Sequence, residues 1–204
     1  MKTKVGCTVE DMEKEKLRAD LRRRLVAITE AQRAEKSRKL CQNLISTQAF
    51  QSACTVMMYM PMSHEADVTG AILKAWQLGK TVAVPKISWE QRHMIPVEIK
   101  SLETGFSTEV MGIRNPVSGR LVPFEDIDIV VAPGLGFDRK GNRLGRGGSY
   151  YDNFFASKKL KALRCGLAFD EQVVEYIPVT AKDEPVDLLV TDKEVIYFNT
   201  RQGG

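Results

Sequence analysis

Residues 128–152, with the sequence DIVVAPGLGFDRKGNRLGRGGSYYD, give the clearest indication of the fold class. This stretch opens with an apolar run, continues through a glycine-rich segment and ends where a helical pattern begins. This order predicts a strand over 127–132, a loop, and a helix over 150–160. In an open α/β sheet such a loop follows the carboxyl end of a strand, which is where ligands bind.

Helices and strands are expected to alternate on both sides of this stretch. The first 45 residues are expected to form two helices, the first with an apolar stripe of Leu17, Leu21, Leu25 and Ile28. Thr29, followed three residues later by Gln32, is the capping-box signal of the second helix, which runs toward Leu44. A third helix is predicted over 69–78, with Gly79 as its stop. Further strands are predicted at 56–60, 81–84 (closed by Pro85), 94–99, 165–169, 188–190 and 195–198, and the shape of 101–123 stays open.

Strands of continuous apolar sequence that alternate with helices are typical of a mostly parallel sheet covered on both faces. The 204 residues show no internal repeat and no linker. We therefore expect one α/β domain over 1–204 with an N-terminal helical segment, in which residues 1–12 are flexible.

Length and composition place the chain among globular proteins. It is 43% hydrophobic and 27% charged, which argues against collagen-like, disordered and disulfide-scaffold proteins. No run approaches the ~20 apolar residues needed to cross a bilayer, and acidic residues near the start argue against a transit peptide. We expect a cytoplasmic protein without a membrane segment, and no sequence feature indicates an obligate protein partner.

Charge and cysteine placement argue against two further kinds of site. The net charge of +4 is modest, and nucleic-acid binding is not expected because such proteins usually concentrate basic residues on one face. The two histidines lie far apart, and the cysteines form no Cys-x-x-Cys pair, so neither structural zinc nor a disulfide framework is predicted. The scattered cysteines are Cys7, Cys41, Cys54 and Cys165.

The glycine-rich segment has the composition of a phosphate-binding loop. Six of the chain's fifteen glycines lie between residues 134 and 148, interleaved with four cations, Arg139, Lys140, Arg143 and Arg146. Glycines let backbone N–H groups approach an anion, the following helix adds its positive end, and arginine forks fit phosphate oxygens. The alternative is an exposed basic turn.

Neither standard nucleotide fingerprint explains this loop. The spacing of Gly136 and Gly141 matches a P-loop, but Asn142 stands where that motif has lysine and Arg143 where it has serine or threonine. Arg139 occupies the place of the third glycine of the dinucleotide motif.

Several residues near the loop each allow a structural and a functional interpretation. Asp152 completes either a Ser-x-x-Asp helix cap with Ser149 or a magnesium site beside phosphate. Tyr150 and Tyr151 are either core aromatics or a stacking surface. Glu65, which follows a predicted strand, is either a surface residue or a ligand contact. Lys14 and Arg18, spaced i and i+4, lie either on a solvated helix face or at a binding site.

With these residues identified, the chain resembles the 5-formyltetrahydrofolate cyclo-ligase family. The strongest match is the segment PGLGFDRKGNRLGRGGSYYD at 133–152. Three further matches follow the family's order, and together they cover almost the whole chain. They are Lys14-x-x-x-Arg18, Tyr59-x-Pro61-x-x-x-Glu65 and Pro185-Val-Asp187-x-x-x-Thr191.

The resemblance implies a three-layer α/β/α sandwich and an ATP- and magnesium-dependent cyclisation of 5-formyltetrahydrofolate to 5,10-methenyltetrahydrofolate, with release of ADP and phosphate. It implies folate contacts at Met60, Glu65 and Tyr151 and Mg²⁺ ligands at Asp152 and Asp187. Arg143 and Arg146 are the cations expected to act in catalysis. The implied ATP contacts are Lys14, Arg18, Arg143, Leu144, Gly145, Arg146, Gly147, Gly148, Ser149, Tyr150 and Tyr151.

The chain departs from the family pattern at three positions and leaves two rival functions open. Ser149 replaces a usual glycine, which matters if the position needs a positive φ. Asn115 stands where an acidic residue is common, and Lys182 where histidine is frequent. The rivals are a binding module that contacts RNA through its basic N-terminal helix, and a different small-molecule kinase or ligase that uses the same loop.

Overall fold

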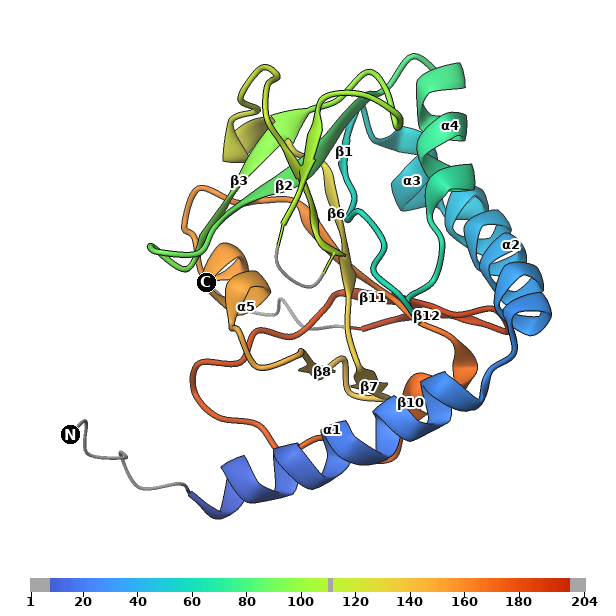
Figure 1. Cartoon of the computed structure of the whole chain (residues 1–204), viewed down its shortest axis with the longest axis vertical. Helices are drawn as coiled ribbons and strands as arrows, with labels where there is room; N and C mark the ends of the chain where they lie inside the picture. The colour runs from blue at the N-terminus through green and yellow to red at the C-terminus, as the bar shows by residue number, and fades with distance from the viewer. Residues whose placement is uncertain (1–7, 110–111, 199–204) are drawn as a thin grey trace.

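The structure is a computed structural model of the chain, and it describes residues 8–109 and 112–198. Its centre is a seven-stranded sheet in the order β12-β11-β9-β6-β1-β2-β3, shown in Figure 1. The inner neighbours are parallel, and the edge strands β3 and β12 are antiparallel to theirs. The strands are β1 (Thr55–Met57), β2 (Thr81–Ser88), β3 (His93–Glu98), β6 (Ile129–Pro133), β9 (Leu163–Leu167), β11 (Leu188–Val190) and β12 (Val195–Tyr197).

Side chains of the central strands alternate between two hydrophobic cores, one on each face of the sheet. In β6, Ile129 and Val131 join one core, whereas Val130 and Ala132 join the other. Because successive side chains of a strand point to opposite faces, a strand buried on both faces must be apolar throughout. This requirement explains the continuous apolar runs in the sequence.

Helices cover both faces, which confirms the expected three-layer α/β/α sandwich. Residues of α2, α3 and α4 pack in the first core, and Phe154 and Phe155 of α5 pack in the second. Helix α1 runs beside the small sheet β10-β7-β8 (Figure 1), and Leu21 approaches so closely that a Cβ on Gly136 would lie 2.6 Å from its Cδ1. The helices are α1 (Val9–Ala27), α2 (Glu30–Ser46), α3 (Gln48–Ser52), α4 (Thr69–Gln77) and α5 (Tyr150–Phe155).

The N-terminal helical segment is present and has capping boxes at both helix starts. Thr8 exchanges hydrogen bonds with Asp11 at the start of α1, and the predicted Thr29–Gln32 box opens α2. Residues 1–7 of the segment expected to be flexible lie outside the described residues, whereas residues 8–12 form the cap and first turn of α1.

Three predicted elements end three or more residues from the expected position, whereas the other predicted strands, including those at 127–132 and 165–169, are shifted by at most two residues. Strand β2 continues through Pro85, which faces Pro96 of β3 at a position without ladder hydrogen bonds, since the bonded pairs alternate from Val82–Ile99. Helix α5 ends at Phe155 instead of 160, and a turn then brings Leu160 into the core. The ladder of β1 ends at Met57, although Met58 is also buried.

The segment 101–123, left open by the sequence, contains the hairpin of β4 (Phe106–Thr108) and β5 (Arg114–Pro116). The third sheet is built from β7 (Gly136–Asp138), β8 (Arg143–Leu144) and β10 (Val173–Val174). Within the part of the chain that the structure describes, no helix has the length and apolar character of a membrane span.

Candidate active site

The glycine-rich segment is an ordered hairpin followed by a loop that leads into α5. Strands β7 and β8 pair antiparallel, and the turn between them is closed by Asp138, whose side chain is fully buried. Its carboxylate accepts hydrogen bonds from the backbone N–H groups of Lys140, Asn142 and Ile177 and from the Asn142 side chain. The turn is therefore anchored by a buried side chain, although Arg139 and Lys140 at its tip are exposed. Sequence reasoning missed Asp138. An aspartate at the start of a turn is a recognisable signal, because its side chain can accept a hydrogen bond from the backbone two residues later.

The loop between β8 and α5 bends through left-handed backbone conformations. Gly147 has a φ of 102°, and Ser149 has a φ of 54°. The concern raised by the missing glycine at 149 is thus confirmed, because a non-glycine residue in this region costs free energy. Ser149 precedes α5, but its side chain makes no capping hydrogen bond. The Ser-x-x-Asp cap is therefore absent.

Asp152 forms a buried ion pair instead of a cap. Its Oδ1 accepts a hydrogen bond from Nη2 of Arg143 at 2.8 Å. The Arg143 side chain is 3% exposed and the Asp152 side chain 14%. The guanidinium of Arg143 lies 5.5 Å from the ring centroid of Tyr151, and its Nε is buried without a hydrogen-bond partner. Arg143 is a predicted phosphate contact and Asp152 a predicted magnesium ligand, and the two side chains thus form an ion pair with each other.

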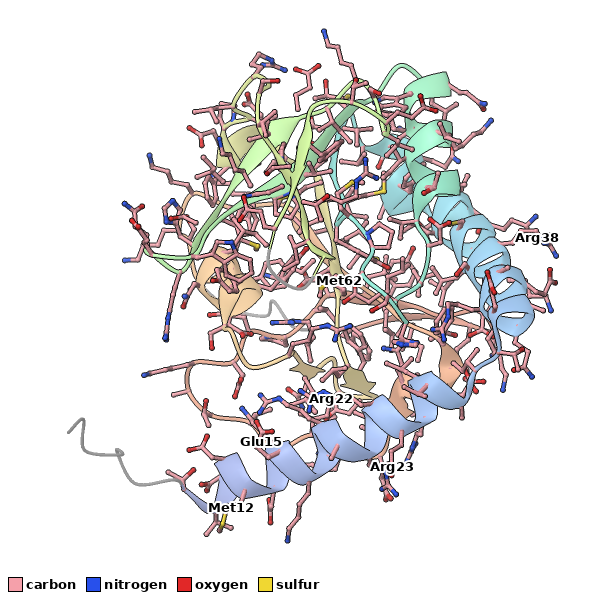
Figure 2. The ribbon with its side chains drawn as sticks, viewed as in Figure 1. Met12, Glu15, Arg22, Arg23, Arg38 and Met62 are labelled. Carbon is pink, nitrogen blue, oxygen red and sulfur yellow. The ribbon has the colours of Figure 1, made fainter. Side chains whose placement is uncertain are left out.

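Helix α1 turns Arg18 toward this loop and Lys14 toward Asp183. Arg18 Nε donates to the backbone oxygen of Gly145 at 2.9 Å, and Lys14 Nζ lies 2.5 Å from Asp183 Oδ2. Both side chains are largely buried, so the solvated-face alternative is wrong for them. Figure 2 shows Met12 and Arg23 on the opposite side of α1, pointing away from the rest of the molecule.

Two of the remaining basic residues of α1 share one acidic partner. Arg23 and Arg24 both pair with Asp20, at 2.9 and 2.7 Å. This pairing lowers the net positive charge that the helix offers to a phosphate backbone. No contact on this helix favours the RNA-binding alternative over the small-molecule site.

Arg146 and Glu65 meet although they are far apart in sequence. Glu65 Oε1 lies 3.0 Å from both Nε and Nη2 of Arg146, and its Oε2 accepts the backbone N–H of Met62 at 2.9 Å. Glu65 is therefore a structured group in the segment after β1, not a free surface residue. Met60, the third predicted folate contact with Glu65 and Tyr151, is partly buried against the first core.

The two tyrosines of the loop differ in their surroundings. Tyr151 packs edge-on against Phe155, and burial raises the pKa of its hydroxyl. Tyr150 packs edge-on against Trp89, with ring centroids 5.8 Å apart. The Trp89 indole donates to Glu109 Oε2 at 2.6 Å, so it is held in place while 38% exposed. Trp89 is a neighbour of the site that sequence reasoning missed.

Asp187 lies just before β11. Its Oδ2 accepts the backbone N–H of Arg164 at 2.9 Å. The Arg164 guanidinium connects this region to α5 by donating to the Phe155 carbonyl and pairing with Glu184. Among residues 8–109 and 112–198, no group of three or more histidine, cysteine or carboxylate side chains is arranged to hold a metal ion.

Two departures from the family pattern have structural consequences. Asn115 is buried and clamps β2 to β5, because its side chain accepts the Ile87 N–H and donates to the Ile87 carbonyl. It also donates to Glu109 Oε1, so Asn115 and Trp89 hydrogen-bond to the two oxygens of the same carboxylate. Lys182 is exposed, with its backbone N–H directed to Thr180 Oγ1.

Comparison with known proteins supports the resemblance. A model of the 5-formyltetrahydrofolate cyclo-ligase family matches residues 10–192. A 5-formyltetrahydrofolate cyclo-ligase of Mus musculus is 31% identical over 89% of this chain and 91% of its own length. One of Haemophilus influenzae is 26% identical over 87% of this chain and 97% of its own length.

Solved structures agree in fold. The 5,10-methenyltetrahydrofolate synthetase of Aquifex aeolicus superposes with a TM-score of 0.79 and 32% identity, covering 94% of this chain and 95% of the other. A second synthetase, from Mycoplasma pneumoniae, reaches a TM-score of 0.72 at 19% identity and supports the fold alone. With the family model spanning most of the sequence and a relative above 30% identity, the chain belongs to the 5-formyltetrahydrofolate cyclo-ligase family of enzymes.

Proposed function

We propose that the protein cyclises 5-formyltetrahydrofolate to 5,10-methenyltetrahydrofolate with ATP and Mg²⁺, releasing ADP and phosphate. Membership of the family supports the reaction. The observation that carries the assignment to this site is the meeting of three distant segments at one loop. Arg18 of α1 donates to Gly145, and Glu65 after β1 pairs with Arg146, so predicted ATP and folate contacts share the loop at 145–146.

The chemistry requires activation of a formamide oxygen, which is a poor leaving group. Transfer of the terminal phosphoryl group of ATP to that oxygen gives an imidate-like phosphate, and ADP leaves. Nitrogen 10 of the folate then attacks the formyl carbon, the ring closes, and the C–O bond breaks to release phosphate. The protein has to align the two substrates and neutralise charge on the moving phosphoryl group.

The cations around the loop suit this task. Arg146 is partly exposed and its partner Glu65 is a candidate folate contact, so phosphate oxygens can compete for its planar guanidinium. Arg18 contacts the loop from α1, and Lys14, one helix turn earlier, adds a second cation beside Asp183. Arg143 is more deeply buried and is suited to fixing the shape of the loop as well as to contacting phosphate.

The residues present fit one part of the proposed magnesium site well. Mg²⁺ binds proteins through one or two carboxylates together with substrate phosphates, and Asp152 offers a carboxylate beside the loop, partly exposed and with Oδ1 held by Arg143. Asp187, whose Oδ2 accepts a backbone N–H, is the second candidate. Bound there with ATP, the ion would neutralise phosphate charge while these carboxylates orient it.

The test is direct, because the methenyl product absorbs light and is followed in solution. The protein is mixed with 5-formyltetrahydrofolate, ATP and Mg²⁺, and we expect product formation that depends on all three. A known cyclo-ligase serves as the positive control. Product in that control and none with this protein would contradict the proposal, and a different product from the same folate would favour another ligase.

Substitution of two arginines of the same segment distinguishes a specific phosphate contact from a general effect of removing positive charge. Arg146→Ala removes a charge-assisted contact of roughly 1.5–3 kcal/mol, which corresponds to a loss in turnover of about 10- to 100-fold. Arg139, which is exposed and paired with Glu194, is the matched control. Arg139→Ala is expected to leave turnover unchanged, and equal losses in both variants would argue against a role for Arg146 at the phosphates.

A further inference from the structure

A buried ion pair joins the start of the chain to a segment near its end. Lys14 Nζ of α1 lies 2.5 Å from Oδ2 of Asp183, and their side chains are 9% and 22% exposed. Lysine is rarely buried without a partner, because an isolated ammonium loses its hydration. Asp183 is thus the carboxylate that compensates the lost hydration of Lys14 in this position.

Asp183 is itself fixed by its own turn. The same Oδ2 accepts the backbone N–H of Thr180 at 2.6 Å and its hydroxyl at 2.8 Å, while the N–H of Asp183 donates back to the Thr180 carbonyl. Burial by itself raises the pKa of the Asp183 carboxyl, but the hydrogen bonds from Lys14 and Thr180 outweigh it and hold the pKa below its usual range. The carboxylate is therefore ionised and preorganised.

The rest of α1 is anchored independently of this pair. Leu21 and Leu25 are buried in the first core, and Arg18, one turn after Lys14, donates to Gly145. Because residues at i and i+4 lie on one helix face, Lys14 and Arg18 both face the loop side. An ammonium group has three N–H donors, and Asp183 is the carboxylate that engages Lys14, which leaves donors for phosphate oxygens.

We propose that Asp183 is a positioning residue that holds the Lys14 ammonium in place to receive the triphosphate of ATP. The inference rests on the proposed function, since it takes Lys14 as an ATP contact. Asp183 acts through Lys14 and touches neither substrate. Its loss leaves the buried Lys14 without a carboxylate partner, so the ammonium is no longer held in one position and the phosphate contact is lost.

The test compares the two substrates. Asp183→Asn keeps the size of the side chain and is expected to raise the KM for ATP by about ten-fold or more, with the KM for 5-formyltetrahydrofolate unchanged and kcat nearly so. Asp170→Asn is the matched control. Asp170 also forms an ion pair with a lysine, since its Oδ2 lies 2.6 Å from Nζ of Lys193, but neither residue is a predicted ATP or folate contact. This control is expected to leave both KM values unchanged. Equal rises in both KM values for Asp183→Asn would overturn the proposal.

A double-mutant cycle excludes a merely structural role. In Lys14→Met, which itself weakens ATP binding, the added Asp183→Asn change is expected to have no further effect on ATP affinity, since coupled residues are not additive. Thr180→Val, which removes one hydrogen bond to the carboxylate, is the milder variant should Asp183→Asn fold poorly. It is expected to raise the KM for ATP by a smaller factor, and additive effects or an unchanged KM would overturn the proposal.

Binding of a non-hydrolysable ATP analogue, measured by calorimetry without folate, separates this inference from the proposed function. If the unaltered protein binds the analogue and Asp183→Asn binds it equally well, the positioning role is wrong and the proposed function stands. If the unaltered protein does not bind the analogue, the proposed function and the positioning role fail together.

Discussion

The Arg143–Asp152 pair should show an unequal cost when either partner is removed. Asp152→Ala leaves a guanidinium that is 3% exposed and already has one unpartnered nitrogen. Breaking a buried pair in this way costs about 3–5 kcal/mol. Arg143→Met keeps most of the aliphatic volume and leaves a carboxylate that is 14% exposed, so that its cost is nearer the 1–3 kcal/mol of an unsatisfied group, roughly.

Equilibrium urea unfolding measures the free energy of unfolding of both variants. In thermal unfolding, the loss expected for Asp152→Ala corresponds, for a protein of this length, to a fall in melting temperature of roughly 6–20 °C. Arg143→Met/Asp152→Ala removes both charges of the pair, and we expect it to cost less than the sum of the single changes. The control is Arg38→Met, because Arg38 pairs with Glu35 on the surface at 56% exposure and should leave the free energy of unfolding unchanged.

The reasoning would be refuted by either of two results. If Asp152→Ala destabilises the protein no more than Arg143→Met does, the burial of the guanidinium has no energetic consequence. If the two single changes add up in the double variant to within about 0.5 kcal/mol, the residues do not interact in the folded state.

Three further predictions concern the loop, the pH dependence of stability and the cysteines. Ser149 has a φ of 54°, so Ser149→Gly should keep full turnover, whereas Ser149→Val should lower the free energy of unfolding by about 1–3 kcal/mol; equal stability of the two variants in urea would contradict this. The folded-state pKa of Asp183 is lowered because hydrogen bonds outweigh the opposing effect of burial, so its contribution is present above the pKa of an unfolded aspartate and lost as pH falls through the folded-state pKa. The gap in urea midpoint between the unaltered protein and Asp183→Asn should therefore be constant near neutral pH and close in acid. Burial raises the pKa of Cys41 to about 11, so a thiol reagent at pH 8 should label the exposed Cys54 long before Cys41, as followed by mass spectrometry; similar rates would show that Cys41 is accessible.

Local sequence signals were sufficient for the central sheet, and they singled out one loop as the candidate site. The strand at β11 was predicted with its observed bounds, and the Thr29–Gln32 capping box opens α2 as expected. Such signals succeed because strand burial and helix capping depend on residues within a few positions of one another. The loop at 134–152 was recognisable because glycine and arginine concentrate there.

The predicted ends of elements were wrong where contacts with a distant segment determine the end of the strand or helix. Pro85 was expected to close β2, yet the strand continues because Pro85 and Pro96 face each other where the ladder needs no donor. Helix α5 was expected to reach residue 160, but Leu160 is placed in the core by a turn. Both outcomes depend on register and packing across the sheet, which no short window of sequence contains.

The α/β class, the mostly parallel sheet and the glycine-rich loop each follow from the order of nearby residues, and they are therefore readable in the sequence. The pairing of charges around that loop depends instead on the folded chain. Lys14 and Asp183 are 169 positions apart, and Arg146 and Glu65 are 81 apart. The residues next to either cation in sequence do not show whether it is paired. Packing of α1 and of the segment after β1 at the carboxyl end of the sheet gives each cation its partner, and for the buried Lys14 an unpaired charge would be too costly to bury.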